Sequence, residues 1–323
     1  MRQGLGWRIC ALSLNQRRQH NKLTPPHISK VPPPEKNVSA QRTLELNSMI
    51  DNQRKQIIFS DLDGTLLDRT TYSYDKALPT IEHLRERGVP IVFCSAKTRV
   101  EQEVYRRKLK VFHPFIVENG GAIFIPTNYF PFSFDFQKTL QDYLVIDLGT
   151  PYEQIRKSLE KIRQEDKLQF KGYGDMSIKE IADVTGLDEE SAELARRREY
   201  TETIMFDAAD VEVKKALEKI KQAGLDYAHG GRFYEVMAGN DKGKATSILT
   251  GLYRRQWDKV STIGIGDSLN DLPMLETVDS PILVQQPEGT WEQINIPQLY
   301  KIEGIGPEGW TRAIGELVIN SKD

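Results

Sequence analysis

Cysteine is scarce in this chain, and it contains no long hydrophobic run. Cys10 and Cys94 are its two cysteines, too few for a framework of disulfide bonds. Proteins of reducing compartments commonly show this composition, so we expect a cytoplasmic protein. No apolar stretch approaches the roughly 20 residues that a helix needs to cross a bilayer. We therefore expect no membrane partner.

Acidic residues are missing from the first 34 positions. Residues 1–34 carry six Lys and Arg, and five prolines cluster between positions 25 and 34. Because such a segment has little apolar surface to bury, we predict a disordered, basic and proline-rich extension over residues 1–54. Its basic character also fits an organellar targeting segment. The alternative is a true start at Met49, which leads directly into the first expected strand.

The remaining sequence has the composition of a globular enzyme. It holds 46 Asp and Glu against 38 Lys and Arg, so we expect no nucleic-acid partner. Hydrophobic residues make up 39% of the chain, and 323 residues are enough for two domains that each bury a core. Composition leaves the oligomeric state open.

Two loops rich in carboxylates each follow a short apolar run. The string DLDGTLL occupies residues 61–67, and GDSLND occupies residues 266–271. Open parallel sheets bind ligands at the carboxyl ends of their strands, so both loops are expected at one site. There Asp61 is suited to attack phosphorus as the nucleophile. Asp63 is suited to protonate the leaving group as general acid and base.

A carboxylate that attacks a phosphate needs cations nearby, because both groups are negative. Mg²⁺ prefers oxygen ligands and keeps several waters. This preference suits Asp61, the backbone carbonyl of Asp63, and Asp267. Asp271 lies one helical turn further on, as a supporting or alternate ligand. The sequence therefore predicts a magnesium site in which all four residues take part.

A lysine and a serine complete the predicted chemistry. Lys242 precedes an apolar helical pattern beside a potential N-cap at Asn240 or Asp241, where anions bind readily. Lys244 is its rival two residues later. Ser95 follows the apolar run at 89–94 and can hydrogen-bond the phosphoryl group, although a serine there can also serve only as a helix N-cap.

Strand-like and helix-like patterns alternate from residue 55 onward, which predicts an α/β fold with a doubly wound parallel sheet. Residues 55–125 and 238–323 are expected to form this core, and residues 126–237 an inserted α+β cap. The expected elements are helices over 77–88, 100–108, 213–224 and 310–318, strands over 89–94, 115–121, 129–136, 143–148 and 202–206, and a helix that starts with a capping box at 177–180.

These motifs, in this order, resemble the haloacid dehalogenase superfamily of aspartate-nucleophile phosphatases, and in particular its capped, Cof-like subclass. Within it the chain is most similar to the mannosyl-3-phosphoglycerate phosphatases. The resemblance spans residues 55–318 and is carried by the strings IIFSDLDGTLLD, SAKTR, VENGGAI, RREYTE, GGRFYEVMAGNDKGKA and GPEGW.

The resemblance implies magnesium-dependent hydrolysis of mannosyl-3-phosphoglycerate to mannosylglycerate and phosphate through an aspartyl phosphate. Other sugar-phosphate phosphatases, acting on glucosyl-3-phosphoglycerate or sucrose phosphate, remain as alternatives, as does a phosphosugar mutase. A non-catalytic regulatory protein on the same fold is a third alternative, but no motif residue is missing.

The implied substrate carries a sugar, a carboxylate and a phosphate, so the cap needs a cation for the carboxylate. Arg232 is the first candidate, with Gly230 and Gly231 allowing close approach of the backbone. Arg198 is a second candidate, although it lies in a charged run of the kind that often faces solvent. The candidate substrate-binding residues on core loops are Lys97, Arg99, Glu118 and Asn119.

Overall fold

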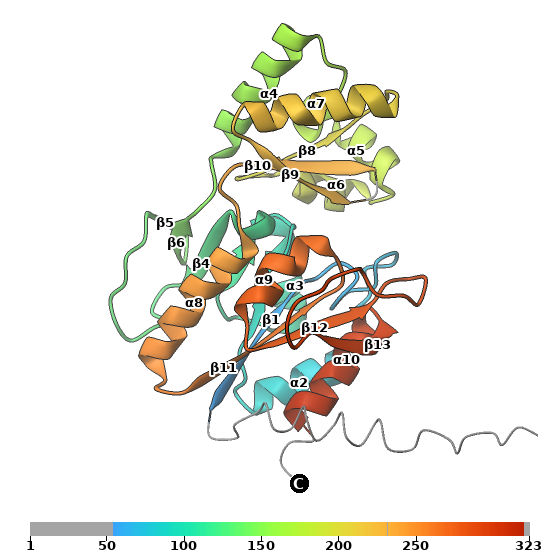
Figure 1. Cartoon of the computed structure of the whole chain (residues 1–323). Helices are drawn as coiled ribbons and strands as arrows, with labels where there is room; N and C mark the ends of the chain where they lie inside the picture. The colour runs from blue at the N-terminus through green and yellow to red at the C-terminus, as the bar shows by residue number, and fades with distance from the viewer. Residues whose placement is uncertain (1–53, 231, 320–323) are drawn as a thin grey trace, which may run out of the picture.

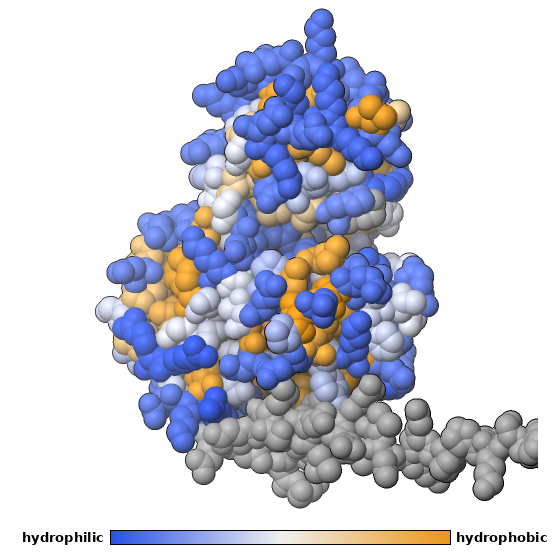
Figure 2. Space-filling view, viewed as in Figure 1, coloured by the Kyte–Doolittle hydropathy of each residue, from blue (hydrophilic) through white to orange (hydrophobic). Residues whose placement is uncertain are grey.

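The computed structural model of the chain describes residues 54–230 and 232–319 (Figure 1). The predictions made for residues 1–53, including disorder, targeting and the start at Met49, lie outside the described residues. Two lobes are stacked one above the other, and Figure 2 shows a waist between them and a mostly hydrophilic surface over the upper lobe.

The lower lobe contains a five-stranded sheet in the order β13-β12-β11-β1-β2, and every neighbouring pair in it is parallel. This arrangement confirms the predicted α/β core. Strand β1 lies between β11 and β2, so the two carboxylate loops leave the sheet side by side. The strands are β1 (Lys55–Ser60), β2 (Ile91–Phe93), β11 (Val260–Gly266), β12 (Ser280–Gln285) and β13 (Tyr300–Ile305).

Helices cover both faces of this sheet (Figure 1). Consecutive strand residues point to opposite faces, so Ile58 packs with α2 and α10 while Ile57 and Phe59 pack with α8 and α9. The core helices are α2 (Leu78–Glu86), α3 (Arg99–Leu109), α8 (Lys242–Gln256), α9 (Leu272–Thr277) and α10 (Pro307–Ile314), which a π-helical turn (Gly315–Ile319) follows.

A second, antiparallel sheet of order β3-β4-β6-β5 borders the core. Its strands are β3 (Phe115–Val117), β4 (Ala122–Pro126), β5 (Lys138–Leu140) and β6 (Tyr143–Asp147). The predicted strand over 129–136 was wrong: these residues form an aromatic loop, and its Phe130 packs with Tyr253 of α8.

We infer that the border between core and cap lies later in the chain than residue 126, the position predicted from the sequence. Val145 and Ile146 of β6 join the two core clusters. The hydrophobic cluster of the upper lobe begins with Ile155. We therefore infer that the cap comprises residues 150–237.

The cap is a four-stranded antiparallel sheet of order β7-β8-β10-β9 with helices α4 and α7 on its outer face (Figure 1). The opposite face looks toward the core, beside α5 and α6. The cap elements are α4 (Tyr152–Asp166), β7 (Lys171–Gly172), α5 (Ile178–Thr185), α6 (Glu189–Arg196), β8 (Glu202–Met205), α7 (Asp210–Gln222), β9 (Asp226–Gly230) and β10 (Phe233–Met237).

Local sequence signals set the helix ends that matter for the site. The predicted capping box at Ser177 and Glu180 starts α5. A second box starts α3, where Thr98 Oγ1 accepts from the Glu101 backbone and Glu101 accepts from the Thr98 N–H. Such caps stabilise a helix by about 1 kcal/mol. The N-cap of α8 is Asp241, which accepts hydrogen bonds from the second and third residues of the helix.

Candidate active site

Asp61 is the first residue after β1, and its backbone N–H donates to the carbonyl of Ile265 in β11 at 2.9 Å. This bond ties the ends of the two strands together just before their loops diverge. The loop then turns at Gly64, whose φ of +83° is unfavourable for other residues. A Cβ on Gly64 would lie 2.8 Å from Asp267 Oδ2, so the close approach of the two loops also requires glycine.

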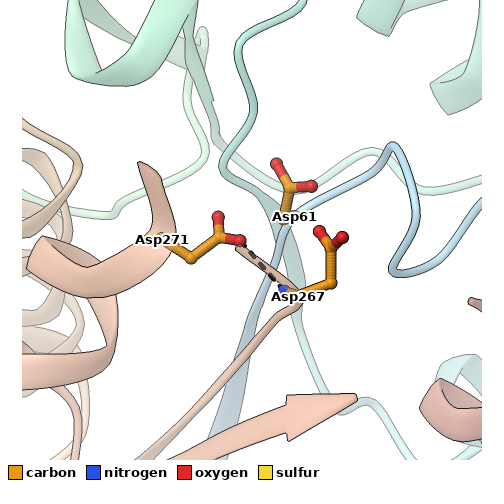
Figure 3. A group of neighbouring side chains, drawn as sticks. All are labelled: Asp61, Asp267 and Asp271. Atoms are coloured by element: carbon orange, nitrogen blue, oxygen red, sulfur yellow. Dashed lines mark hydrogen bonds between the residues drawn. The ribbon is translucent and has the colours of Figure 1, made fainter. Parts of the chain in front are cut away.

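Three buried carboxylates meet at this point, as Figure 3 shows. One oxygen each from Asp61, Asp267 and Asp271 lies within 4.8 Å of the others. The backbone N–H of Asp267 donates to Asp271 Oδ2 at 3.0 Å, which fixes the second loop. Lys242 Nζ lies 2.9 Å from Asp61 Oδ1 and 2.7 Å from Asp271 Oδ1. The structure thus brings together residues separated by about 200 positions in the chain.

Burial sets the electrostatics of this cluster. It raises the pKa of Asp61 well above the usual range, and Lys242 counteracts that shift. It also raises the pKa of Asp267 to about 6, with Asp271 adding to the effect and Arg69 opposing it. Burial opposes the charge of Lys242 as well, but its carboxylate neighbours hold the lysine pKa well above its usual value. The cluster therefore favours a bound cation.

The acidic cluster fits a divalent metal ion by its donor chemistry. Carboxylate oxygens on a rigid strand end are the ligands that hard cations prefer. Arg69 contacts Asp267, so the protein already holds a positive group against this carboxylate. The side chain of Asp63 is not part of this cluster. The magnesium role predicted for Asp63 concerns its backbone carbonyl alone.

Asp63 and Lys97 form a separate pair. Lys97 Nζ lies 3.1 Å from Asp63 Oδ2 and 3.6 Å from Glu101 Oε1. Burial opposes the charge of Lys97, but these carboxylates raise its pKa above the usual value. Asp63 Oδ1 has no hydrogen-bond partner among the described residues. Lys97 therefore holds Asp63 in place and leaves one oxygen free for another group.

A cavity of about 450 Å³ separates core and cap at this site. Of the predicted site residues, Asp61, Asp63, Ser95 and Arg198 line it. Ser95 is 1% exposed, and its Oγ accepts from the Lys97 N–H at 3.4 Å. Behind Asp61 lie Lys242, Asp267 and Asp271. Lys97 lines a neighbouring cavity of about 370 Å³, and Tyr72 borders both cavities.

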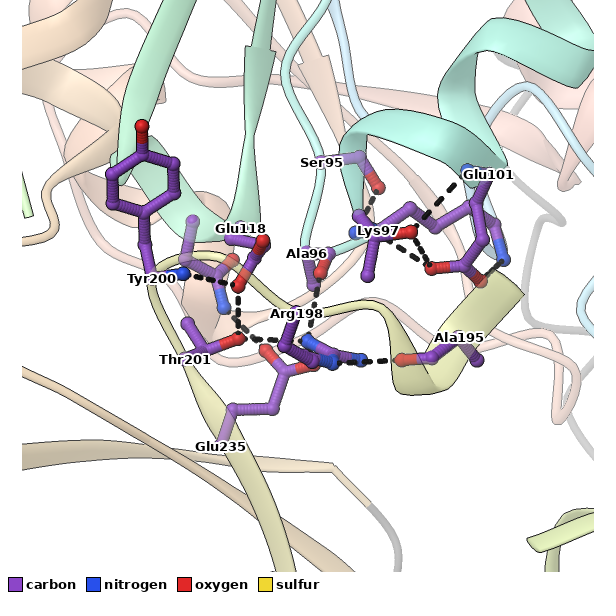
Figure 4. A network of polar contacts seen from close by, with 12 residues as sticks. Ser95, Ala96, Lys97, Glu101, Glu118, Ala195, Arg198, Tyr200, Thr201 and Glu235 are labelled. Carbon is purple, nitrogen blue, oxygen red and sulfur yellow. Dashed lines mark hydrogen bonds and ion pairs between the residues drawn. The ribbon is translucent and has the colours of Figure 1, made fainter. Parts of the chain in front are cut away.

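Glu118 of the core anchors the cap segment between α6 and β8, as Figure 4 shows. It accepts hydrogen bonds from the N–H groups of Glu199 and Tyr200 and from Thr201 Oγ1, at 2.6 to 2.9 Å. Burial raises the pKa of Glu118 to about 7, against the lowering effect of Arg198 and of these donors. Glu118 thus holds this cap segment against the core, and its predicted contact with substrate stays a prediction.

Two other predicted substrate residues, Arg99 and Asn119, also join core to cap. Arg99 on α3 pairs with Glu199 at 2.8 Å. Asn119 has a left-handed backbone conformation (φ 56°), and its Nδ2 donates to Glu235 Oε2 at 2.5 Å. Arg198 Nη1 reaches Glu235 Oε1 at 3.1 Å, and its side chain is 7% exposed. The charged run that contains Arg198 therefore does not face solvent at this residue.

Arg232 lies elsewhere. It is exposed in the turn between β9 and β10, and it donates to the backbone carbonyl of Val184 rather than lining the cavity. Gly230 ends β9, and Gly231 lies outside the described residues. The structure therefore does not bring Arg232 to the candidate active site.

Several cavity residues were not identified from the sequence. They include Arg69, Tyr173, Thr203, Ala228, Phe233 and Glu235. Alternation along β8 and β10 was the available signal, because residues two apart share a sheet face. What the sequence did not reveal is which face of the cap sheet looks toward the core.

Comparison with known proteins agrees with this geometry. The model of the haloacid dehalogenase-like hydrolase family matches residues 58–288. The match covers well over half of the chain, which therefore belongs to this hydrolase family.

The similarity to individual relatives is more specific. The chain is 48% identical over 265 residues to the glucosyl-3-phosphoglycerate/mannosyl-3-phosphoglycerate phosphatase of Methanococcoides burtonii, covering 82% of this chain and 97% of that protein. It is 43% identical over 229 residues to the mannosyl-3-phosphoglycerate phosphatase of Pyrococcus furiosus, covering 71% and 90%. A solved sugar phosphatase of HAD subclass IIB shares the fold, with a TM-score of 0.53 and 16% identity over 82% of this chain and 99% of the other.

Among the described residues, every helix is too short or too polar to cross a membrane.

Proposed function

We propose that this protein hydrolyses mannosyl-3-phosphoglycerate, and also glucosyl-3-phosphoglycerate, to the glycosylglycerate and phosphate with the help of Mg²⁺. The observation that carries the proposal is that Asp61 and Asp63 line the cavity while Asp267 and Lys242 lie behind Asp61. The second substrate is included because the Methanococcoides burtonii relative is named for both.

The geometry supports a two-step reaction. In the first step Asp61 attacks phosphorus, the bond from phosphorus to the ester oxygen breaks, and Asp63 gives its proton to that oxygen. In the second step Asp63 takes a proton from water, which attacks the aspartyl phosphate and releases inorganic phosphate. Asp61, Asp267 and the Asp63 carbonyl, with Asp271 in support, would hold Mg²⁺, and the bound ion would supply positive charge against the phosphoryl group.

The residues around Asp61 prepare it for attack. Lys242 donates to Asp61 Oδ1 and orients the carboxylate. Ser95 Oγ lines the cavity beside it and is placed to hydrogen-bond the phosphoryl oxygens. Arg69 and Arg198 also line the cavity, and we propose that they balance the negative charge of the phosphate and the glycerate carboxylate. Arg198 thereby takes the role first assigned to Arg232.

Phosphate release from a panel of substrates tests the function. We expect turnover of mannosyl- and glucosyl-3-phosphoglycerate, with much lower kcat/KM for sucrose phosphate and for p-nitrophenyl phosphate. Conversion of mannose 1-phosphate to mannose 6-phosphate, measured in parallel, reports mutase activity. Preferential turnover of sucrose phosphate, or isomerisation without phosphate release, would contradict the proposal.

Removal of divalent cations should stop the reaction while leaving the fold intact. In excess EDTA we expect kcat to fall by at least about 10³-fold, because several kcal/mol of charge stabilisation are lost. Mg²⁺ added in excess of the chelator should restore the activity. The melting temperature should change little, since the hydrophobic core of the sheet does not involve the acidic cluster. Undiminished turnover in EDTA would refute the metal assignment.

A further inference from the structure

We propose that Thr203 hydrogen-bonds a hydroxyl of the hexosyl group of the substrate, and that the cap-sheet face around it forms the sugar subsite. The inference rests on the proposed function and goes beyond it by assigning the part of the cavity that recognises the neutral end of the molecule. The residues of this surface are Tyr173, Thr203, Ala228, Phe233 and Glu235, and we refer to them as the sugar face.

The register of the cap sheet places these residues together. Thr203 in β8 lies opposite Glu235 in β10, and Glu235 lies opposite Ala228 in β9. Residues directly opposite each other in an antiparallel sheet point to the same face. Phe233, two positions before Glu235, shares that face. All four line the cavity, so this is the face of the cap sheet that looks toward Asp61.

Thr203 has an unused hydrogen-bonding group on this face. Its side chain is buried, with 3% of the residue exposed, and Oγ1 has no hydrogen-bond partner among the described residues. Buried hydroxyls are nearly always hydrogen-bonded in native proteins. A ligand hydroxyl in the cavity supplies the missing partner, because a hydroxyl can both donate and accept.

The neighbours of Thr203 have the character of a sugar-binding surface. The Tyr173 and Phe233 rings meet edge to face with centroids 5.9 Å apart, which forms an apolar wall. Ala228, in the edge strand β9, is small and leaves room beside Glu235. Glu235 is fixed by Asn119 and Arg198. An apolar wall with a few placed polar groups suits a hexose, which has C–H faces and hydroxyl edges.

Thr203 differs in charge from the residues at the reacting end of the cavity. Lys242, Asp61 and the metal-binding carboxylates lie on the core, where the phosphate must reach the nucleophile. Thr203 lies on the cap and carries no charge. The phosphate group of the substrate therefore belongs beside the core residues, and the neutral hexosyl group extends toward the sugar face.

The experiment compares Thr203→Val, which has nearly the same shape without the hydroxyl, with Thr203→Ser, which keeps it. We expect Thr203→Val to lower the ratio of kcat/KM for mannosyl-3-phosphoglycerate to kcat/KM for p-nitrophenyl phosphate by about tenfold, the scale of one buried hydrogen bond. Thr203→Ser should keep most of this ratio. Thr139→Val, the same change at an exposed position of β5, serves as the matched control and should behave as wild type.

A second variant tests the shape of the surface. Ala228→Leu fills the space beside Glu235 on the sugar face, so the same ratio should fall by about 100-fold or more. Binding of 3-phosphoglycerate, which lacks the hexosyl group, should be unchanged in a competition assay. An unchanged ratio in both Thr203→Val and Ala228→Leu would overturn the inference, as would equal losses on all substrates. Failure of the proposed function is distinguishable, because the wild-type enzyme would then not release phosphate from mannosyl-3-phosphoglycerate.

Discussion

Asp61→Asn abolishes turnover if Asp61 is the nucleophile, and we expect kcat to fall by about 10⁴-fold or more. The amide nitrogen and oxygen of asparagine attack phosphorus poorly, and asparagine also removes one carboxylate from the acidic cluster. The fold should persist, because Asn fills nearly the same volume beside Lys242. Steady-state phosphate release with mannosyl-3-phosphoglycerate, together with a melting curve, measures both quantities.

Two further variants make this result specific. Asp63→Asn should also be slow with mannosyl-3-phosphoglycerate, but it should still form the covalent intermediate with p-nitrophenyl phosphate, whose leaving group needs little help from an acid. Asp75→Asn changes an exposed carboxylate and should leave kcat unaltered. Activity of Asp61→Asn within tenfold of wild type would disprove the nucleophilic mechanism.

Lys242→Met should produce the second large loss. Methionine matches the length of lysine but carries no charge, so Asp61 and Asp271 lose the ammonium group that they share at 2.9 and 2.7 Å. Removing one partner of a buried ion pair costs on the order of 3–5 kcal/mol of stability. We therefore expect a lower melting temperature and a kcat reduced by about 10³-fold, since a misplaced nucleophile adds several kcal/mol to the barrier.

Lys244→Met is the matched control, because Lys244 is exposed two residues further along the same helix. It should retain wild-type activity and stability. Excess Mg²⁺ should not rescue Lys242→Met if the lysine orients Asp61 directly. Equal defects in the two variants, or full rescue by Mg²⁺, would show that Lys242 does not act on the nucleophile.

The geometry of the core site was largely predictable because it depends on strand ends. Asp61 and Asp267 each follow a buried strand, and in a parallel sheet such positions converge wherever the strands are neighbours. The structure also distinguishes two pairs of residues between which the sequence left the choice open, one for the N-cap of α8 and one for the lysine. Asp241 rather than Asn240 caps α8, and Lys242 rather than Lys244 is buried.

The cap was less predictable because its surfaces depend on tertiary pairing. Arg232 looked suited to an anion from its glycine neighbours, but the turn directs it to Val184 on α5. The aromatic residues at 129–136 have strand-forming character, yet they pack as a loop against α8. At both places, contacts with distant segments outweigh what the local sequence suggests. A single sequence does not reveal such contacts.

The central position of β1 makes the active site a late product of folding. Lys55 pairs with Val260, 205 residues further along the chain, so β1 leaves the ribosome long before the strand that completes its pairing. The cap, continuous in sequence, can pair β8 with β10 in the meantime. Closing so long a loop is entropically costly and makes folding slow. Asp61 and Asp267 become neighbours only when this closure is complete, so the active site cannot form before β11 has paired with β1.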